Sequence, residues 1–161
     1  MTTLLLLLTV LGPQQAPINF SGTWAFDEAR SSQKQPGGHL VIAKLLGDEV
    51  TIRQDQSVMR LAIRIGPSTV DAEYALDGSE SRNLSSEGGG KPDVTVISRA
   101  TWEDGKLVIR SSSTSEAQGR AVTTETKRVL WIDADGSLIL DRTGTPASEI
   151  PASRSVYRKV R

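Results

Sequence analysis

The chain has 161 residues, no cysteine, a single histidine, and equal numbers of basic and acidic residues, 19 of each. The absence of cysteine excludes disulfides, thiol nucleophiles, thiolate metal sites and a lipid-bearing N-terminal cysteine. The length fits one domain, and the balanced charge gives no global field that would favour nucleic acid or an anionic membrane.

Residues 1–17, MTTLLLLLTVLGPQQAP, are typical of a secretory signal peptide. Their apolar core at residues 4–11 is far shorter than the roughly 20 residues that span a bilayer. No basic residue precedes the leucines, so an apolar N-terminal tail is the alternative. We expect a single mature domain at residues 18–161, secreted or periplasmic.

Short segments of alternating apolar residues, separated by turn residues, follow this leader. A strand is predicted at residues 20–26, and a helical turn capped by Asp27 at residues 27–32. Residues 40–45 and 49–54 flank the sequence LGDE and predict a hairpin. Three further strands are predicted in this half of the chain, at residues 59–65, 70–76 and 81–84.

Two more hairpins are predicted in the second half, each around an Asp-Gly turn. Residues 94–102 and 106–114 form the first, and residues 122–132 and 137–142 form the second. A last strand is predicted at residues 154–160.

These segments predict an all-β protein, an antiparallel up-and-down meander of about eight to ten strands with little helix. Such a sheet must protect its edges, and closure into a barrel does so. A sandwich of two sheets is the alternative.

The stretch FSGTWAF at residues 20–26 resembles the first-strand Gly-x-Trp signature of the calycin barrels, which include lipocalins and fatty-acid-binding proteins. The resemblance implies that Gly22 and Trp24 close the barrel floor as structural residues. Five segments are also similar, in order, to small exported bacterial lipocalin-like domains: FSGTWAFDEARS, YALDGSESRN, ATWEDGKLVIRS, DGSLILDRT and SVYRKV. This second resemblance, over most of residues 19–160, implies an architecture and no particular activity.

Fatty-acid-binding proteins end in an Arg-x-Tyr strand that holds the ligand carboxylate inside the barrel. If Tyr157 takes the position of the tyrosine, Ser155 stands where the arginine belongs. Arg154 is one residue earlier and therefore on the opposite face of the strand. The resemblance thus implies no carboxylate clamp at this strand, although a neutral apolar ligand still fits.

Arginines recur within the predicted strands, at Arg53, Arg60, Arg64, Arg99, Arg110 and Arg128. Their expected place is the solvated outer face, paired with acids; pointing inward, a few of them would recognise an anion. Trp102 and Trp131 stand at strand ends, where they pack in the core or rim, or alternatively stack on a ligand. The candidate ligand-binding residues are Trp102, Trp131, Tyr157, Arg60, Arg99 and Arg128.

No catalytic constellation is found in the sequence. His39 is the only histidine and is expected at a solvated loop edge, and no Gly-x-Ser-x-Gly elbow is present. The EGGGK sequence in residues 87–91 lacks the spacing of a phosphate-binding loop. We therefore expect no catalytic residue, no metal site and no cofactor.

The sequence predicts a non-catalytic protein outside the cytoplasm that binds a small apolar or amphipathic molecule in its barrel. The alternative is a barrel filled by its own side chains that serves as an interaction or structural module of the cell envelope. An enzyme ranks third, because barrels of this type support several chemistries. The expected partner is a small lipophilic ligand, with no nucleic acid and no membrane after leader cleavage; protein partners are not predicted.

Overall fold

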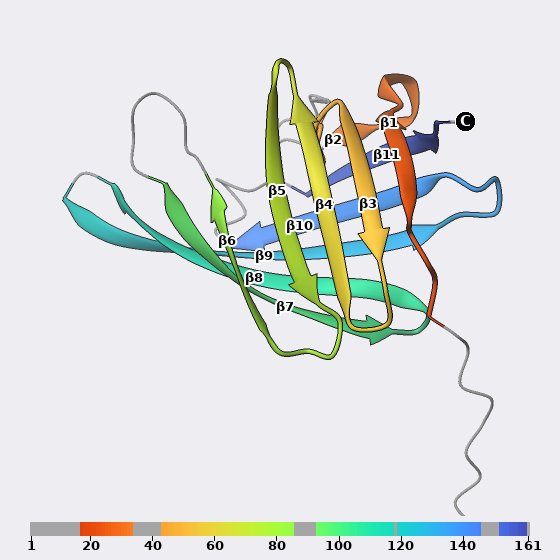
Figure 1. The fold of residues 1–161 in the computed structure, drawn as a ribbon. Helices are drawn as coiled ribbons and strands as arrows, with labels where there is room; N and C mark the ends of the chain where they lie inside the picture. Colours follow the sequence, from red (N-terminus) through yellow and green to blue (C-terminus); the bar gives the residue numbers. More distant parts are fainter. Residues whose placement is uncertain (1–16, 34–42, 86–92, 118, 146–151, 161) are drawn as a thin grey trace, which may run out of the picture.

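The computed structural model describes residues 17–33, 43–85, 93–117, 119–145 and 152–160 (Figure 1). In these residues the one helical element is η1 (Glu28–Arg30), a single 3₁₀ turn, and no helix is long and apolar enough to cross a membrane. The strands are β1 (Gly22–Phe26), β2 (Ser32–Gln33), β3 (Glu49–Gln54), β4 (Val58–Ile65), β5 (Ser68–Ala75), β6 (Glu80–Ser85), β7 (Val94–Glu103), β8 (Lys106–Ala117), β9 (Arg120–Ile132), β10 (Leu138–Thr145) and β11 (Ser153–Lys159).

All the strand pairs are antiparallel, and the order in the sheet is β5-β4-β3-β1-β11-β10-β9-β8-β7-β6, with β2 added beside β11. The first strand therefore pairs with the last, as Trp24 opposite Lys159 and Phe26 opposite Tyr157 show. Figure 1 shows β3–β5 crossing in front of β7–β10 at a steep angle, so that the sheet wraps around one interior. The prediction of an antiparallel, up-and-down all-β barrel is confirmed.

The barrel closes at a seam between β5 and β6, where side chains replace the backbone ladder. The Asn83 side chain accepts a hydrogen bond from Glu73 N at 2.8 Å and donates one to Glu73 O at 3.0 Å. Ser81 Oγ accepts a bond from Ala75 N at 2.8 Å. Asn83 thus presents one donor and one acceptor to β5, as a backbone residue would.

A predicted turn explains the tight hairpin between β7 and β8. Asp104 and Gly105 both have positive φ, 49° and 75°, which a two-residue type I′ turn requires. Such turns match the right-handed twist of the flanking strands. This hairpin is therefore specified locally by the sequence.

The predicted hairpin around LGDE is wrong in its first half. Residues 49–54 form β3, but the described residues 43–45 are not in a strand. Their segment is bonded to side chains of β11: Leu45 N donates to Ser155 Oγ at 3.2 Å, and Leu46 N donates to Tyr157 Oη at 2.7 Å. These two backbone N–H groups bond to side chains of β11 instead of to a partner strand.

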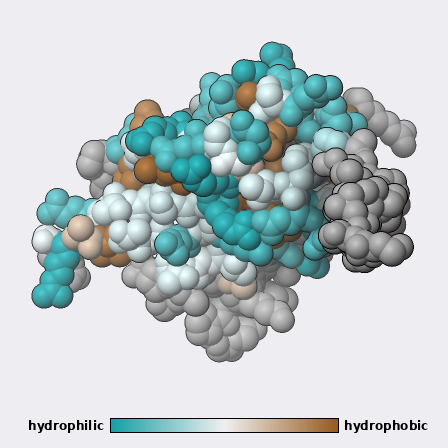
Figure 2. Space-filling view, turned by 90° about the horizontal axis from the view of Figure 1, so that it is seen from below, coloured by the Kyte–Doolittle hydropathy of each residue, from teal (hydrophilic) through white to brown (hydrophobic). Residues whose placement is uncertain are grey.

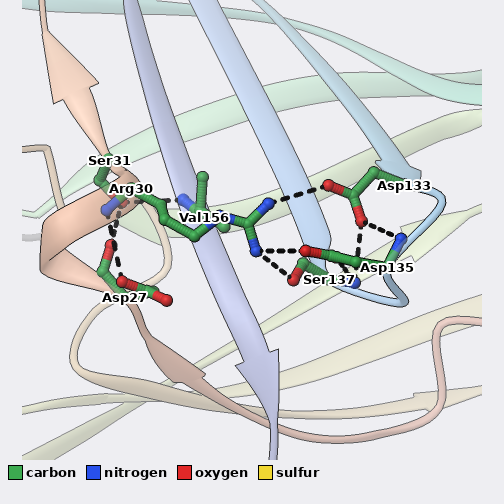
Figure 3. Close-up of polar contacts among 7 residues, drawn as sticks. All are labelled: Asp27, Arg30, Ser31, Asp133, Asp135, Ser137 and Val156. Carbon is green, nitrogen blue, oxygen red and sulfur yellow. Dashed lines mark hydrogen bonds and ion pairs between the residues drawn. The ribbon is translucent and has the colours of Figure 1, made fainter.

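The predicted turn after β1 is confirmed as η1, capped by Asp27. Its Arg30 guanidinium reaches the turn between β9 and β10, bonding Asp133 at 3.1 Å, Asp135 at 2.7 Å and Ser137 Oγ at 2.8 Å (Figure 3). Residues far apart in the sequence are thereby joined at one end of the barrel.

Most of the predicted leader, residues 1–16, lies outside the described residues, as do His39 and residues 87–91 of the EGGGK segment.

Candidate functional site

The inward face of β7–β11 changes from apolar to polar along the strands. Three rows of side chains, each running across the sheet, show this change. Residues directly opposite one another on paired strands share a face and contact their neighbours. The leucine row consists of Leu107, Leu130, Leu140 and Ser155. The arginine row consists of Ile109, Arg128, Arg142 and Ser153. The hydroxyl row consists of Ser98, Ser111 and Thr126.

The leucine row is fully buried, with exposed fractions of 0–1%. Its three leucines belong to a core that also includes Phe20, Trp24, Ile52, Met59, Leu61, Tyr74, Leu138 and Tyr157. Phe20 stacks on Trp102, with ring centroids 5.9 Å apart. We call this part of the interior, from the leucine row to Trp24, the apolar half.

The arginine row places two guanidinium groups side by side inside the barrel. Arg128 on β9 and Arg142 on β10 are directly opposite in the register. Arg128 Nη1 lies 3.3 Å from the hydroxyl of Tyr74, to which it donates, and Tyr74 belongs to β5 on the other side of the barrel. Because Arg128 contacts Tyr74 across the barrel, the side chains of the arginine row point into the interior.

Three buried polar atoms of this row have no hydrogen-bond partner: Arg128 Nε, Arg142 Nε and Ser153 Oγ. No ion pair in the described part of the chain involves either arginine. Burial lowers the pKa of the Arg142 guanidinium, and the adjacent charge of Arg128 lowers it further. The row is therefore a concentration of positive charge and unused donors.

Beyond the arginine row, the inward residues are small and polar. Ser98 and Ser111 are buried and share a hydrogen bond of 2.8 Å. Further along, Val96, Ser113 and Thr124 are only partly buried. We call this part, from the arginine row outward, the polar half.

Tyr157 and Ser155 are buried and already have partners. The Tyr157 hydroxyl accepts from Leu46 N and donates to Gly47 O at 3.2 Å, and Ser155 Oγ donates to Ala43 O. Burial, more than any other cause, raises the pKa of the Tyr157 hydroxyl to about 12. Both side chains hold the segment before β3 in place.

Gly22 and Trp24 lie in β1, next to the C-terminal strand. Trp24 is 3% exposed, and its indole N–H donates to Phe20 O at 2.9 Å. Gly22 has a φ of +141°, and a Cβ there would lie 2.9 Å from Lys159 Cε. A glycine therefore suits the close approach of Lys159, whose ammonium lies 5.4 Å from the centroid of the Trp24 ring.

The other candidate ligand residues are divided between the two faces of the sheet. Trp102 faces inward against Phe20. Trp131 faces outward, with the Lys106 ammonium 4.4 Å from the centroid of its ring. Arg60 and Arg99 are exposed and paired with Glu73 and Glu80, and they line surface hollows of about 460 and 410 Å³ respectively.

Of the arginines expected in the strands, Arg128 lies in the interior, whereas Arg142, Ser153 and Tyr74 were not predicted as site residues. A signal for Arg142 was present: Leu138, Leu140 and Arg142 alternate along one strand and therefore share its face. In the described residues, no group of three or more histidine, aspartate or glutamate side chains is placed to hold a metal ion.

Comparisons with known proteins support the fold. No protein-family model and no curated protein matches the sequence. Crystal structures of two mutants of the fluorescent protein UnaG are similar, with TM-scores of 0.55 and 0.54 and sequence identities of 24% and 25%. In each case the similarity covers 88% of this chain and 96% of the UnaG chain. The chain therefore has the fold of a calycin barrel of the fatty-acid-binding-protein type.

Proposed function

We propose that this protein binds a small apolar or amphipathic molecule inside its barrel, outside the cytoplasm and without catalysing a reaction. One observation carries the proposal: the leucine row is fully buried, whereas Val96, Ser113 and Thr124, further along the same face of the same strands, are only partly buried. A barrel filled by its own side chains along the whole length of these strands would bury both sets. The fold shared with UnaG is consistent with a binding role.

The outer surface supports this choice over an interaction module. Of the large exposed apolar side chains, Leu84 lies on the outer face of β6 and Val160 at the C-terminal end, whereas Ile65 and Val70 share the face of β4 and β5 that carries the buried Met59 and Leu61. Seen from below, the surface is mainly hydrophilic, and its hydrophobic areas are small and separate (Figure 2). Protein-binding surfaces are more often contiguous apolar patches.

The test uses Nile red, an uncharged lipophilic dye, and two matched variants. Val96→Trp fills the polar half from an inward position, and Thr95→Trp places the same side chain on the outer face next to it. We expect saturable dye binding by the wild-type protein and by Thr95→Trp, and a loss of binding in Val96→Trp. Equal binding by all three would place the dye outside the barrel, and no binding by any of them would favour the solid barrel.

The proposed location rests on the leader-like residues 1–17. Expression of the full chain in a Gram-negative host, followed by fractionation and N-terminal sequencing, tests it. We expect a periplasmic chain that begins near residue 17 or 18. A full-length chain in the cytoplasmic fraction would contradict export and leave the binding proposal unaffected.

A further inference from the structure

We propose that the gap between the start of β7 and the projecting end of β8 binds an extended peptide of another protein as an added strand, and that this peptide carries a lysine or an arginine. The site is formed by two strand edges, and it does not depend on the ligand proposed for the barrel interior.

The first argument is that the β8–β9 hairpin extends beyond its neighbours. Strand β8 is paired with β9 up to its last residue, Ala117, whereas its pairing with β7 ends at Ser113 opposite Val96. Figure 1 shows the hairpin projecting past the start of β7. Strand β7 itself continues to Val94, where it is paired with β6. Two strands that are neighbours elsewhere in the sheet are therefore not paired with each other here.

The second argument is the direction of the backbone groups at this gap. A two-residue turn joins β7 and β8, so the flanking residues Glu103 and Lys106 form a hydrogen-bonded pair, and every second pair along the ladder is of the same kind. Continued past the last pair, this alternation directs the N–H and C=O groups of Thr95, Thr114 and Glu116 toward the gap. Such a row of groups is a template for a further strand.

The third argument is space. A hollow of about 690 Å³ lies at the gap, and its described lining consists of Gly119 and of residues within 93–97 and 112–116, so both strands contribute. Ligand pockets are typically about 300–1,000 Å³ in volume. Native proteins commonly protect an exposed strand edge with lysine or proline. Residues 114–117 contain neither, so this edge is open to an incoming strand.

The fourth argument is charge, which indicates the chemistry of the peptide. Asp93 and Glu116 line the hollow from its two sides, both are exposed, and none of the described lining residues is basic. Opposite charges on neighbouring strands stabilise a sheet, whereas like charges destabilise it. A peptide with a lysine or an arginine on the face shared with Glu116 is therefore favoured over an acidic peptide.

The experiment measures the fluorescence anisotropy of fluorescein-labelled peptides with blocked ends, titrated with the full protein. The test peptide is TVKVT, in which β-branched residues favour an extended chain. The charge control is TVEVT, and the edge control is TVKVT with methylated backbone nitrogens, which cannot donate to a strand. We expect saturable binding of TVKVT, and binding of each control peptide that is weaker by about tenfold or more.

Two pairs of protein variants locate the site. Thr114→Pro removes an N–H group that points into the gap, and Thr123→Pro removes one at the opposite edge of the same hairpin; both lose the same hydroxyl contact of 2.9 Å. Thr114→Pro should weaken TVKVT binding about tenfold or more, and Thr123→Pro should bind as the wild type does. Glu116→Lys should reverse the preference between TVKVT and TVEVT. Glu125→Lys, exposed on β9 and outside the hollow, should leave this preference unchanged.

Equal binding of the three peptides, or binding that neither Thr114→Pro nor Glu116→Lys alters, would overturn the proposal. Self-association of the wild type in analytical ultracentrifugation that both proline variants abolish would show that the hairpin of a second copy fills the gap, and would overturn it as well. Nile red binding should be the same in Thr114→Pro and the wild type. If Thr114→Pro loses the dye, the substitution disturbs the barrel, and the reversal of preference in Glu116→Lys decides. Absence of peptide binding with intact dye binding contradicts this site alone and leaves the proposed function standing.

Discussion

The apolar half and the polar half of the barrel interior are built from the same strands but organised for different purposes. On β10, Leu140 is fully buried in the leucine row, and Arg142, two residues further along the same face, has an unpartnered guanidinium nitrogen. Each apolar side chain buried in the first region stabilises the fold by about 1.5–3 kcal/mol. The second region contributes little such burial, so a barrel of this kind can change its recognition groups with small loss of stability.

The largest expected effect tests where the stability resides. Leu140→Ala removes a fully buried side chain from the apolar half and should lower the free energy of unfolding by about 2–5 kcal/mol in urea titrations. The control Thr143→Ala lies on the exposed face of the same strand and should change it by less than about 0.5 kcal/mol. Similar losses in both variants would contradict the proposed division of the interior.

Tyr157→Phe tests the contact between the apolar half and the segment before β3. The variant leaves Leu46 N and Gly47 O without their partner, so the free energy of unfolding should fall by about 1–3 kcal/mol at neutral pH.

The same residue also gives a dependence on pH. The folded-state pKa of Tyr157, about 12, is above the unfolded value of about 10, so both states are neutral below pH 10. Between these two pH values the unfolded chain loses a proton that the folded chain retains, and stability falls as the pH rises. Tyr157→Phe should lose less stability than the wild type over this interval. An equal slope for both proteins would contradict the assignment to Tyr157.

A smaller effect is expected in the polar half at the Ser98–Ser111 pair. Either Ser98→Ala or Ser111→Ala leaves a buried hydroxyl without its partner and should cost about 1 kcal/mol. The double variant removes both hydroxyls and should cost less than the sum of the two single changes. Strict additivity would show that the two hydroxyls do not depend on each other.

The smallest effect is expected at the seam. Asn83→Ala removes two solvent-exposed hydrogen bonds to Glu73 and should reduce the free energy of unfolding by about 1 kcal/mol or less. Hydrogen exchange is the more sensitive measurement, and the Glu73 amide should exchange faster than in the wild type. Unchanged exchange would mean that this amide is protected in another way.

The sequence was sufficient to predict the strands because alternation and Asp-Gly turns are local signals. Asp104 and Gly105 specify a hairpin with no help from the rest of the molecule. The segment at residues 43–45 was predicted wrongly because its backbone is bonded to Ser155, more than 100 positions away in the chain. Such a contact has no local signature.

The arginine row shows the same limit of prediction from local sequence, here in the barrel interior. Alternation along β10 was enough to place Arg142 on the face of Leu138 and Leu140. The contact between Arg128 and Tyr74 depends on the curvature of the sheet, because the two residues are 54 positions apart in the chain. A site that is assembled from three or four strands becomes visible only when the barrel is closed.

The seam between β5 and β6 also affects whether the protein associates with other copies of itself. A strand edge with free backbone groups can accept a strand from another chain and so begin aggregation. By engaging both polar groups of Glu73, the Asn83 side chain occupies the place that an intruding strand would take. The Asn83 side-chain amide thus blocks this strand edge. Its removal should appear first as self-association at high protein concentration.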